Sequence, residues 1–123
     1  MSRTLVASLA VAVLSLALAA SAMSRSSATT LNGTVGPGFT IKLTKGGKKV
    51  KSLKAGSYKF KISDKSSIHN FVLEREKGGK FEKQLTSVSF TGSKSVTLKL
   101  KQGKYKYYCA PHEGDMKGFF TVK

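Results

Sequence analysis

Hydrophobic and polar residues alternate along most of the chain outside its N-terminal part. The alternation is clearest over residues 39–44, 58–63 and 96–101, and in the first of these segments we expect Phe39 and Ile41 to face a core. A period of two residues is typical of a β-strand with one buried and one solvated face. Glycines separate the segments at turn-like intervals. The pattern predicts an all-β domain of about seven to eight short strands, arranged as a sandwich or a barrel.

The N-terminal part has a different pattern. Leu5 to Ala20 contains only Leu, Val, Ala and Ser, and a single basic residue, Arg3, precedes it. Ala20-Ser21-Ala22 follows as a small-x-small cleavage site, which is typical of a secretory signal peptide. The alternative is an uncleaved membrane anchor, although the apolar run is shorter than the ~20 residues that a span needs. We therefore predict a signal peptide over residues 1–22, a Ser/Thr-rich linker over 23–30 and one domain over 31–123, in a secreted or periplasmic protein.

Composition narrows the class of protein further. The chain has 123 residues, the length of a single domain, and its 22 Lys and Arg against 6 Asp and Glu give a formal net charge of +16. A single Cys excludes an intramolecular disulfide framework and a Cys-rich zinc module. The basic residues are almost all lysines, whereas proteins that read nucleic acids favour arginine. We therefore expect no binding to nucleic acid.

The residue types that bind transition metals are rare in the chain and lie close together in its sequence. Cys109, His112 and Met116 fall within eight residues, and the other His of the chain, His69, begins the apolar-alternating segment 69–73. One thiolate, two imidazoles and one thioether form the ligand set of a blue-copper site, in which the Met is a weak axial ligand.

The strand pattern places two of these side chains on the core side. Cys109 shares its parity with Tyr107, and His69 shares its parity with Phe71, so both are expected to point inward at strand ends. A proline and a glycine after Cys109 bend the chain into a loop that can bring the other two side chains to the same point. The predicted metal ligands are His69, Cys109, His112 and Met116.

The sequence resembles the cupredoxin family, close to plastocyanin and pseudoazurin, over nearly the whole mature chain. Residues 107–112 (YYCAPH) match the signature ahead of the ligand loop, and His69-Asn70 match the upstream His with its neighbouring Asn. The resemblance implies a Greek-key β-sandwich with one type-1 copper per chain, bound by the four residues above. It also implies that Asn70 ties the two ligand loops together; the alternative is an ordinary strand-end residue. Three residues separate His112 from Met116, a spacing between those of plastocyanin-like and amicyanin-like loops.

We expect the protein to carry single electrons and not to be an enzyme, since four protein ligands leave no open position for substrate. By the resemblance, His112 is the electron port, ringed by Ala110, Pro111 and the turn at residues 36–38. Other interpretations are an unpaired thiol, a Cys109–His112 pair for acyl transfer, a copper carrier or storage protein, and a Lys-rich sandwich that binds anionic surfaces.

The charge predicts the kind of partner. A large positive field speeds encounter with oppositely charged partners. We expect a monomer that meets an anionic redox protein, or an anionic membrane surface, near His112.

Overall fold

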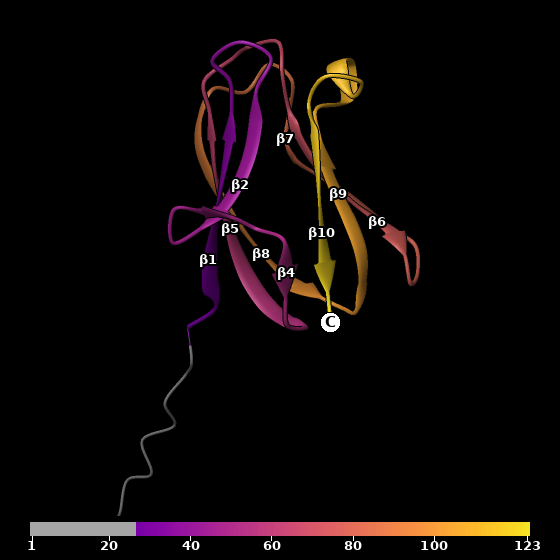
Figure 1. Cartoon of the computed structure of the whole chain (residues 1–123). Coiled ribbons are helices and arrows are strands. Elements are labelled where there is room, and N and C mark those ends of the chain that lie inside the picture. The colour runs from indigo at the N-terminus through magenta and orange to yellow at the C-terminus, as the bar shows by residue number, and fades with distance from the viewer. Residues whose placement is uncertain (1–26) are drawn as a thin grey trace, which may run out of the picture.

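The computed structural model describes residues 27–123, so the predicted signal peptide and the first half of the predicted linker, residues 23–26, lie outside the described residues. Two five-stranded β-sheets pack face to face (Figure 1). The strands are β1 (Thr29–Val35), β2 (Ile41–Lys45), β3 (Lys48–Lys49), β4 (Ser52–Leu53), β5 (Gly56–Asp64), β6 (Phe71–Lys77), β7 (Phe81–Thr86), β8 (Gly92–Leu100), β9 (Gly103–Tyr108) and β10 (Lys117–Val122). A single turn of 3-10 helix, η1 (Ala110–His112), follows β9. Within residues 27–123, no helix is long and apolar enough to cross a membrane.

The strand order confirms the predicted all-β sandwich. One sheet has the order β3-β2-β1-β5-β8 and the other β4-β10-β9-β6-β7. β1 pairs with β5 in parallel, as β4 does with β10, and the remaining pairs are antiparallel. Ten strands are present in the described residues instead of seven to eight, because β3 and β4 are two-residue strands that alternation cannot reveal. Thr29 and Thr30, placed in the linker by the sequence analysis, are the first residues of β1.

The core lies between the sheets and is rich in aromatic side chains. Phe60 of one sheet is fully buried, and on the other sheet the rings of Phe71 and Tyr107 stack with centroids 5.7 Å apart. The Tyr107 ring lies against β10 at Gly118, where any Cβ would overlap the ring. Burial raises the pKa of the Tyr107 hydroxyl, and a hydrogen bond with the Leu43 backbone opposes that shift. Glycine at position 118 therefore lets a large ring fill the core directly before the strand end at which Cys109 lies.

Two predictions of strand membership are wrong. Phe39 is not a core-facing strand residue: it is 56% exposed, and β2 begins only at Ile41. A turn precedes that strand, closed by a 2.8 Å hydrogen bond from the Gly36 N–H to the Thr40 carbonyl. Similarly, His69 and its neighbour precede β6 instead of beginning it. Both residues lie in loops, and the alternation of inward and outward side chains that holds within a strand does not continue into a loop.

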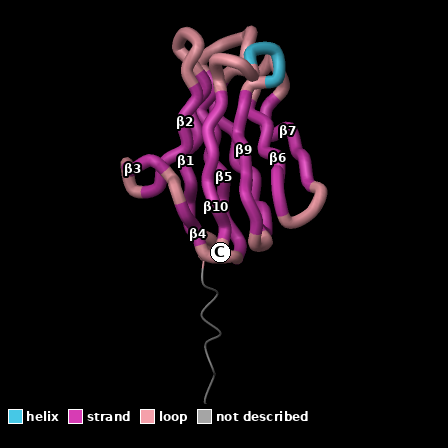
Figure 2. Tube along the Cα trace, turned by 45° about the vertical axis from the view of Figure 1, so that its right-hand side comes forward, coloured by secondary structure: helices cyan, strands magenta, loops and turns pink. Residues whose placement is uncertain are grey.

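Three loops meet at one end of the sandwich. They join β1 to β2, β5 to β6 and β9 to β10, and η1 lies among them (Figures 1 and 2). β1 begins at the opposite end. The topology therefore brings residues 36–40, 65–70 and 109–116 to one place, and these segments contain all four predicted ligands.

Candidate metal centre

His69, Cys109 and His112 lie together at this end of the sandwich. The Nδ1 atoms of the two imidazoles are 3.0 Å apart, and the Cys109 Sγ lies 3.6 Å from Nδ1 of His69 and 3.8 Å from Nδ1 of His112. Cys109 and His69 are buried, at 0% and 1% exposure, and His112 is half-buried. The structure thus brings three of the four predicted ligands to one point, and it leaves only the His112 side chain in partial contact with solvent.

Backbone hydrogen bonds fold the loop after β9 onto itself. The Cys109 N–H donates to the Met116 carbonyl at 3.0 Å, and the His112 N–H donates to the Cys109 carbonyl at 3.1 Å. The Met116 N–H donates to the His112 carbonyl at 2.9 Å. These bonds, with Pro111 in the first turn of η1, direct the His112 ring back toward the Cys109 sulfur.

Met116 closes this loop and is fully buried as part of the hydrophobic core. Its backbone is tied to both Cys109 and His112 by the hydrogen bonds above. The fourth predicted ligand is therefore held next to Cys109 and His112 by backbone hydrogen bonds, and its side chain is buried.

Asn70 connects the two ligand loops. Its Oδ1 accepts a 2.8 Å hydrogen bond from the Ala110 N–H, although the two residues lie forty positions apart. Asn70 is 1% exposed, and its Nδ2 lies 3.5 Å from the Gln84 side-chain oxygen on β7. The structure thus supports the interpretation of Asn70 as a tether between loops over that of an ordinary strand-end residue.

A buried carboxylate fixes the loop that contains His69. Asp64, at the end of β5, accepts hydrogen bonds from the Ser66 N–H at 3.0 Å and from the Thr86 hydroxyl at 3.3 Å. Thr86 in turn accepts from the Phe71 N–H at 2.9 Å, next to the start of β6. Burial raises the pKa of Asp64, while these hydrogen bonds and the nearby His69 oppose that rise.

Asp64 is not among the residues predicted for the site, although its place in the sequence carries a signal. Asp64 continues the inward parity of Tyr58, Phe60 and Ile62, so an acidic residue stands at a core-facing position of a strand whose other charges are lysines. Charged residues at such positions are rare unless they are hydrogen-bonded.

Phe39 is a second residue of the site that the sequence analysis placed elsewhere. Its ring lies edge-on to both imidazoles, with centroids 5.1 Å from His69 and 4.9 Å from His112. The ring is more than half exposed, so it covers the histidines from the solvent side. Two glycines with positive φ, Gly36 and Gly38, shape the turn that holds it there.

Lys106 links the ligand loop to the sheet. Its Nζ lies 2.5 Å from Glu113, the residue after His112, and 3.2 and 3.0 Å from Glu74 and Glu76 on β6. The Lys106 side chain is only 12% exposed, and the hydrogen bond to Glu113 is the main cause that raises the pKa of Lys106. The Lys106 ammonium also lies over the ring of Tyr108, 4.6 Å from its centroid. Burial and a 2.9 Å hydrogen bond to Glu82 raise the pKa of Tyr108 to about 12.

The three donor atoms suit a metal ion. A triangle with sides of 3.0, 3.6 and 3.8 Å has its centre about 2 Å from each corner, the range of metal bonds to His nitrogen and Cys sulfur. Among the described residues the cluster contains no carboxylate. Two imidazole nitrogens and one sulfur in a trigonal arrangement are the donor set that copper takes in blue-copper proteins.

Comparison with protein families agrees with this donor set. Residues 45–123, more than half of the chain, match the model of the copper binding proteins of the plastocyanin/azurin family. The chain belongs to this family. The resemblance to cupredoxins expected from the sequence is thereby confirmed, and the His69, Cys109 and His112 cluster is consistent with one type-1 copper per chain.

Solved structures of copper proteins have a similar fold. A rusticyanin variant with Gln in place of a Met matches with a TM-score of 0.57 and 16% identity, over 79% of this chain and 80% of its own. Rusticyanin from Thiobacillus ferrooxidans matches with a TM-score of 0.54 and 20% identity, over 79% of each chain. A reduced Cu(I) form of an amicyanin variant matches with a TM-score of 0.52 and 14% identity, over 80% of this chain and 87% of its own. No curated protein sequence matches the chain.

Proposed function

We propose that this protein is a type-1 copper protein that carries single electrons between redox partners and is not an enzyme. The ligands in this proposal are His69, Cys109, His112 and Met116. The observation that supports it best is the triangle of two imidazole nitrogens and one sulfur, in a chain of the copper-binding family.

The surroundings of the site favour electron transfer over substrate chemistry. An imidazole, thiolate and thioether set is acceptable to both Cu(I) and Cu(II), so a change of redox state needs little rearrangement of the ligands. The tether from Asn70 to Ala110 and the hydrogen bonds within the loop hold the ligands in place in either state. Four protein ligands leave no position for a substrate to bind the metal.

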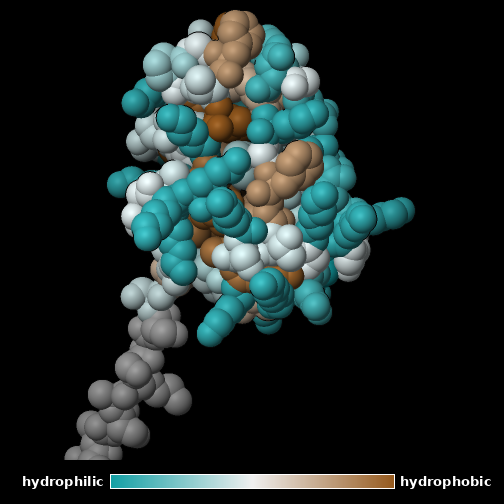
Figure 3. All heavy atoms as spheres, viewed as in Figure 1, coloured by the Kyte–Doolittle hydropathy of each residue, from teal (hydrophilic) through white to brown (hydrophobic). Residues whose placement is uncertain are grey.

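The end of the sandwich offers an apolar contact surface for a partner. Phe39 and Ile68 are 56% and 52% exposed, and Ala110 and Pro111 are exposed beside the half-buried His112. Apolar atoms are visible at this end of the molecule at the top of Figure 3. In the proposal, a redox partner docks here and electrons pass through the His112 edge, with Phe39 as part of the contact.

The net charge supports an anionic partner, and the apolar N-terminal segment supports secretion to the periplasm or beyond. The lysines speed the encounter, whereas the apolar end makes the contact, because charges in the contact itself would lose their hydration. In this proposal the protein acts as a monomer.

The proposal is tested by redox cycling of the copper-loaded protein beside a metal chelator. Addition of a one-electron reductant should bleach the colour, and an oxidant should restore it, with one electron per copper and no copper lost to the chelator. Transfer of copper to the chelator on reduction would instead indicate a copper carrier. A colour that does not respond to reductant would contradict both functions.

A further inference from the structure

The two sheets of the sandwich differ in how their charges are compensated. On the β4-β10-β9-β6-β7 sheet, Glu74 and Glu76 surround Lys106, and Glu82 lies on the neighbouring strand. On the β3-β2-β1-β5-β8 sheet, the only acidic residue is Asp64, which is 2% exposed and points inward. The strands of the β3-β2-β1-β5-β8 sheet therefore place no negative charge on its outer face.

Strand register defines the residues of this outer face. Lys61 on β5 pairs with Asn32 on β1 and with Ser95 on β8, and Thr34 on β1 pairs with Lys42 on β2. Continuing the alternation gives a face, here called the lysine face, that contains Lys, Ser, Thr and Asn and neither an acidic nor an apolar side chain. Its members are Thr30, Asn32, Thr34, Lys42, Thr44, Ser57, Lys59, Lys61, Ser63, Ser93, Ser95, Thr97 and Lys99.

The shape of the lysine face suits a broad surface. The four strands β2, β1, β5 and β8, about 4.8 Å apart, give a width of roughly 15 Å, and the nine-residue strands β5 and β8 give a length of roughly 30 Å. The four lysines of the face, Lys42, Lys59, Lys61 and Lys99, are exposed. Between them stand short hydroxyl side chains, which do not prevent the sheet from approaching a surface closely.

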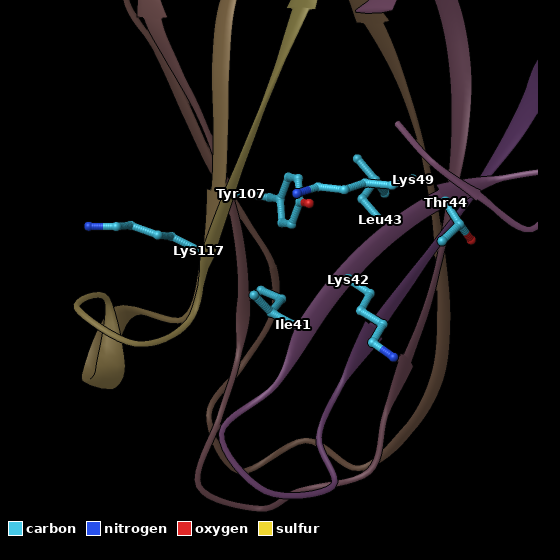
Figure 4. A pocket seen from close by; sticks show the side chains of 7 residues that line it. All are labelled: Ile41, Lys42, Leu43, Thr44, Lys49, Tyr107 and Lys117. Atoms are coloured by element: carbon cyan, nitrogen blue, oxygen red, sulfur yellow. The ribbon is translucent and has the colours of Figure 1, made fainter. Parts of the chain in front are cut away.

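Lys42 and Lys49 lie at the β2–β3 edge of the sheet, and their side chains point in different directions. A cavity of about 300 Å³ lies between the sheets, lined by residues that include Lys42, Lys49 and Tyr107 (Figure 4). Lys49 extends across this cavity toward Tyr107, whereas Lys42 points away from it (Figure 4). The amino group of Lys42 is thus available to a ligand outside the sandwich.

We propose that the lysine face binds the surface of an anionic lipid bilayer. A broad array of lysines without apolar side chains suits the phosphate layer of a membrane, because each ammonium acts as a point charge and nothing on the face needs to insert. The ligand loops lie at the end of the sandwich and not on this face (Figure 1). A molecule that lies on the membrane by its lysine face therefore keeps the His112 end open to a redox partner at the side.

The test is a vesicle-binding assay on the full chain with two charge-matched variants. Lys42→Gln, Lys59→Gln, Lys61→Gln and Lys99→Gln together remove four charges from the lysine face. Lys77→Gln, Lys80→Gln, Lys83→Gln and Lys104→Gln remove four charges from exposed positions on or beside the other sheet, none of which makes an ion pair in the described structure. Each protein is mixed with vesicles of phosphatidylcholine and phosphatidylglycerol, and with pure phosphatidylcholine vesicles, which report any partition by the apolar N-terminal segment.

The native chain should prefer the anionic vesicles, and the preference should fall as ionic strength rises from about 0.01 to 0.15 M. A lysine close to an anionic bilayer contributes roughly fivefold to binding, so the lysine-face variant should bind at least a hundredfold more weakly. The control variant should change much less. All three proteins should bind copper alike, so this test does not depend on the electron-transfer proposal.

Three results would overturn the membrane proposal. Equal loss in the two variants would mean that net charge alone attracts the vesicles. No preference of the native chain for anionic vesicles would exclude a membrane role for the face. Tight binding of soluble polyphosphate without binding of anionic vesicles would assign the face to a polymer.

Discussion

The Asn70 side chain accepts a 2.8 Å hydrogen bond from the backbone N–H of Ala110, and this single bond joins the loop of His69 to the loop of Cys109 and His112. The first loop leads into β6 and the second follows β9, and these two strands pair from Val72 and Tyr108 onward, so the Asn70 bond extends their contact into the ligand loops. A loss of the bond would leave the partly buried Ala110 N–H without this partner and weaken the link between the two loops.

Asn70→Ala should therefore lower the free energy of unfolding by about 1–3 kcal/mol and weaken copper binding. Urea unfolding and copper titration measure the two effects. Gln84→Ala, which removes the second and longer contact of Asn70, is the matched control and should change stability by less than about 0.5 kcal/mol. Equal effects in the two variants would mean that the contact with Gln84, and not the hydrogen bond from Ala110, accounts for the contribution of Asn70.

Phe39→Ala should slow electron transfer to a protein partner by about tenfold, because it removes the exposed aromatic ring that covers both imidazoles. Stopped-flow mixing with a redox protein measures the rate. Phe119→Ala is the control: Phe119 is 43% exposed but lies on β10 beneath the Lys104 ammonium, outside the ligand loops. A similar drop in both variants would contradict docking at the His112 end.

Asp64 should make the stability of the copper-free protein depend on pH. Burial raises the pKa of Asp64 in the folded state above its ordinary value, so the folded chain holds a proton over a range in which the unfolded chain has lost it. The contribution of Asp64 to the free energy of unfolding is therefore largest below a pH of about 4. It decreases as the pH rises through the folded-state pKa.

Asp64→Asn should remove that decrease while keeping an oxygen for the Ser66 N–H. Urea unfolding of the copper-free protein across the acidic to neutral range measures the slope, and Asp115→Asn controls for the change in net charge. An unchanged slope in Asp64→Asn would contradict the role given to burial.

Lys106→Met should destabilise the fold by about 1–2 kcal/mol, because three carboxylates that share one ammonium would then face one another. The effect should weaken at high salt, which screens the carboxylates. Lys104→Met, on the same strand and exposed, should change stability by less than about 0.5 kcal/mol. Salt-independent destabilisation would mean that packing of the Lys106 stem, and not its charge, matters.

Much of this site was open to prediction from residue types and parity. Alternation placed Tyr107 and Cys109 inward, and the structure buries both. The turn that exposes Phe39 was missed because parity is informative only inside a strand. The three carboxylates meet at Lys106 because Glu74 pairs with Lys106 across β6 and β9. The register between two strands is not visible in one sequence.

The ligand assignment makes different predictions for the sulfur residues. Cys109→Ser should abolish the colour of the copper protein, because a hydroxyl does not replace a thiolate. Met116→Leu should keep the colour and raise the reduction potential, since the axial ligand tunes the potential and its loss disfavours Cu(II). Visible absorption and voltammetry check the two variants. A colourless Met116→Leu protein would mean that Met116 has more than a weak axial role.

The central claim is that copper is bound by the Cys109 thiolate together with the imidazoles of His69 and His112. Titration of Cu(II) into the metal-free native protein tests this claim most directly. We expect an intense blue absorption that rises linearly to one equivalent of copper per chain and then stops. Cys109→Ser, titrated in parallel, should stay colourless. A colourless native protein, or a blue Cys109→Ser protein, would contradict the claim.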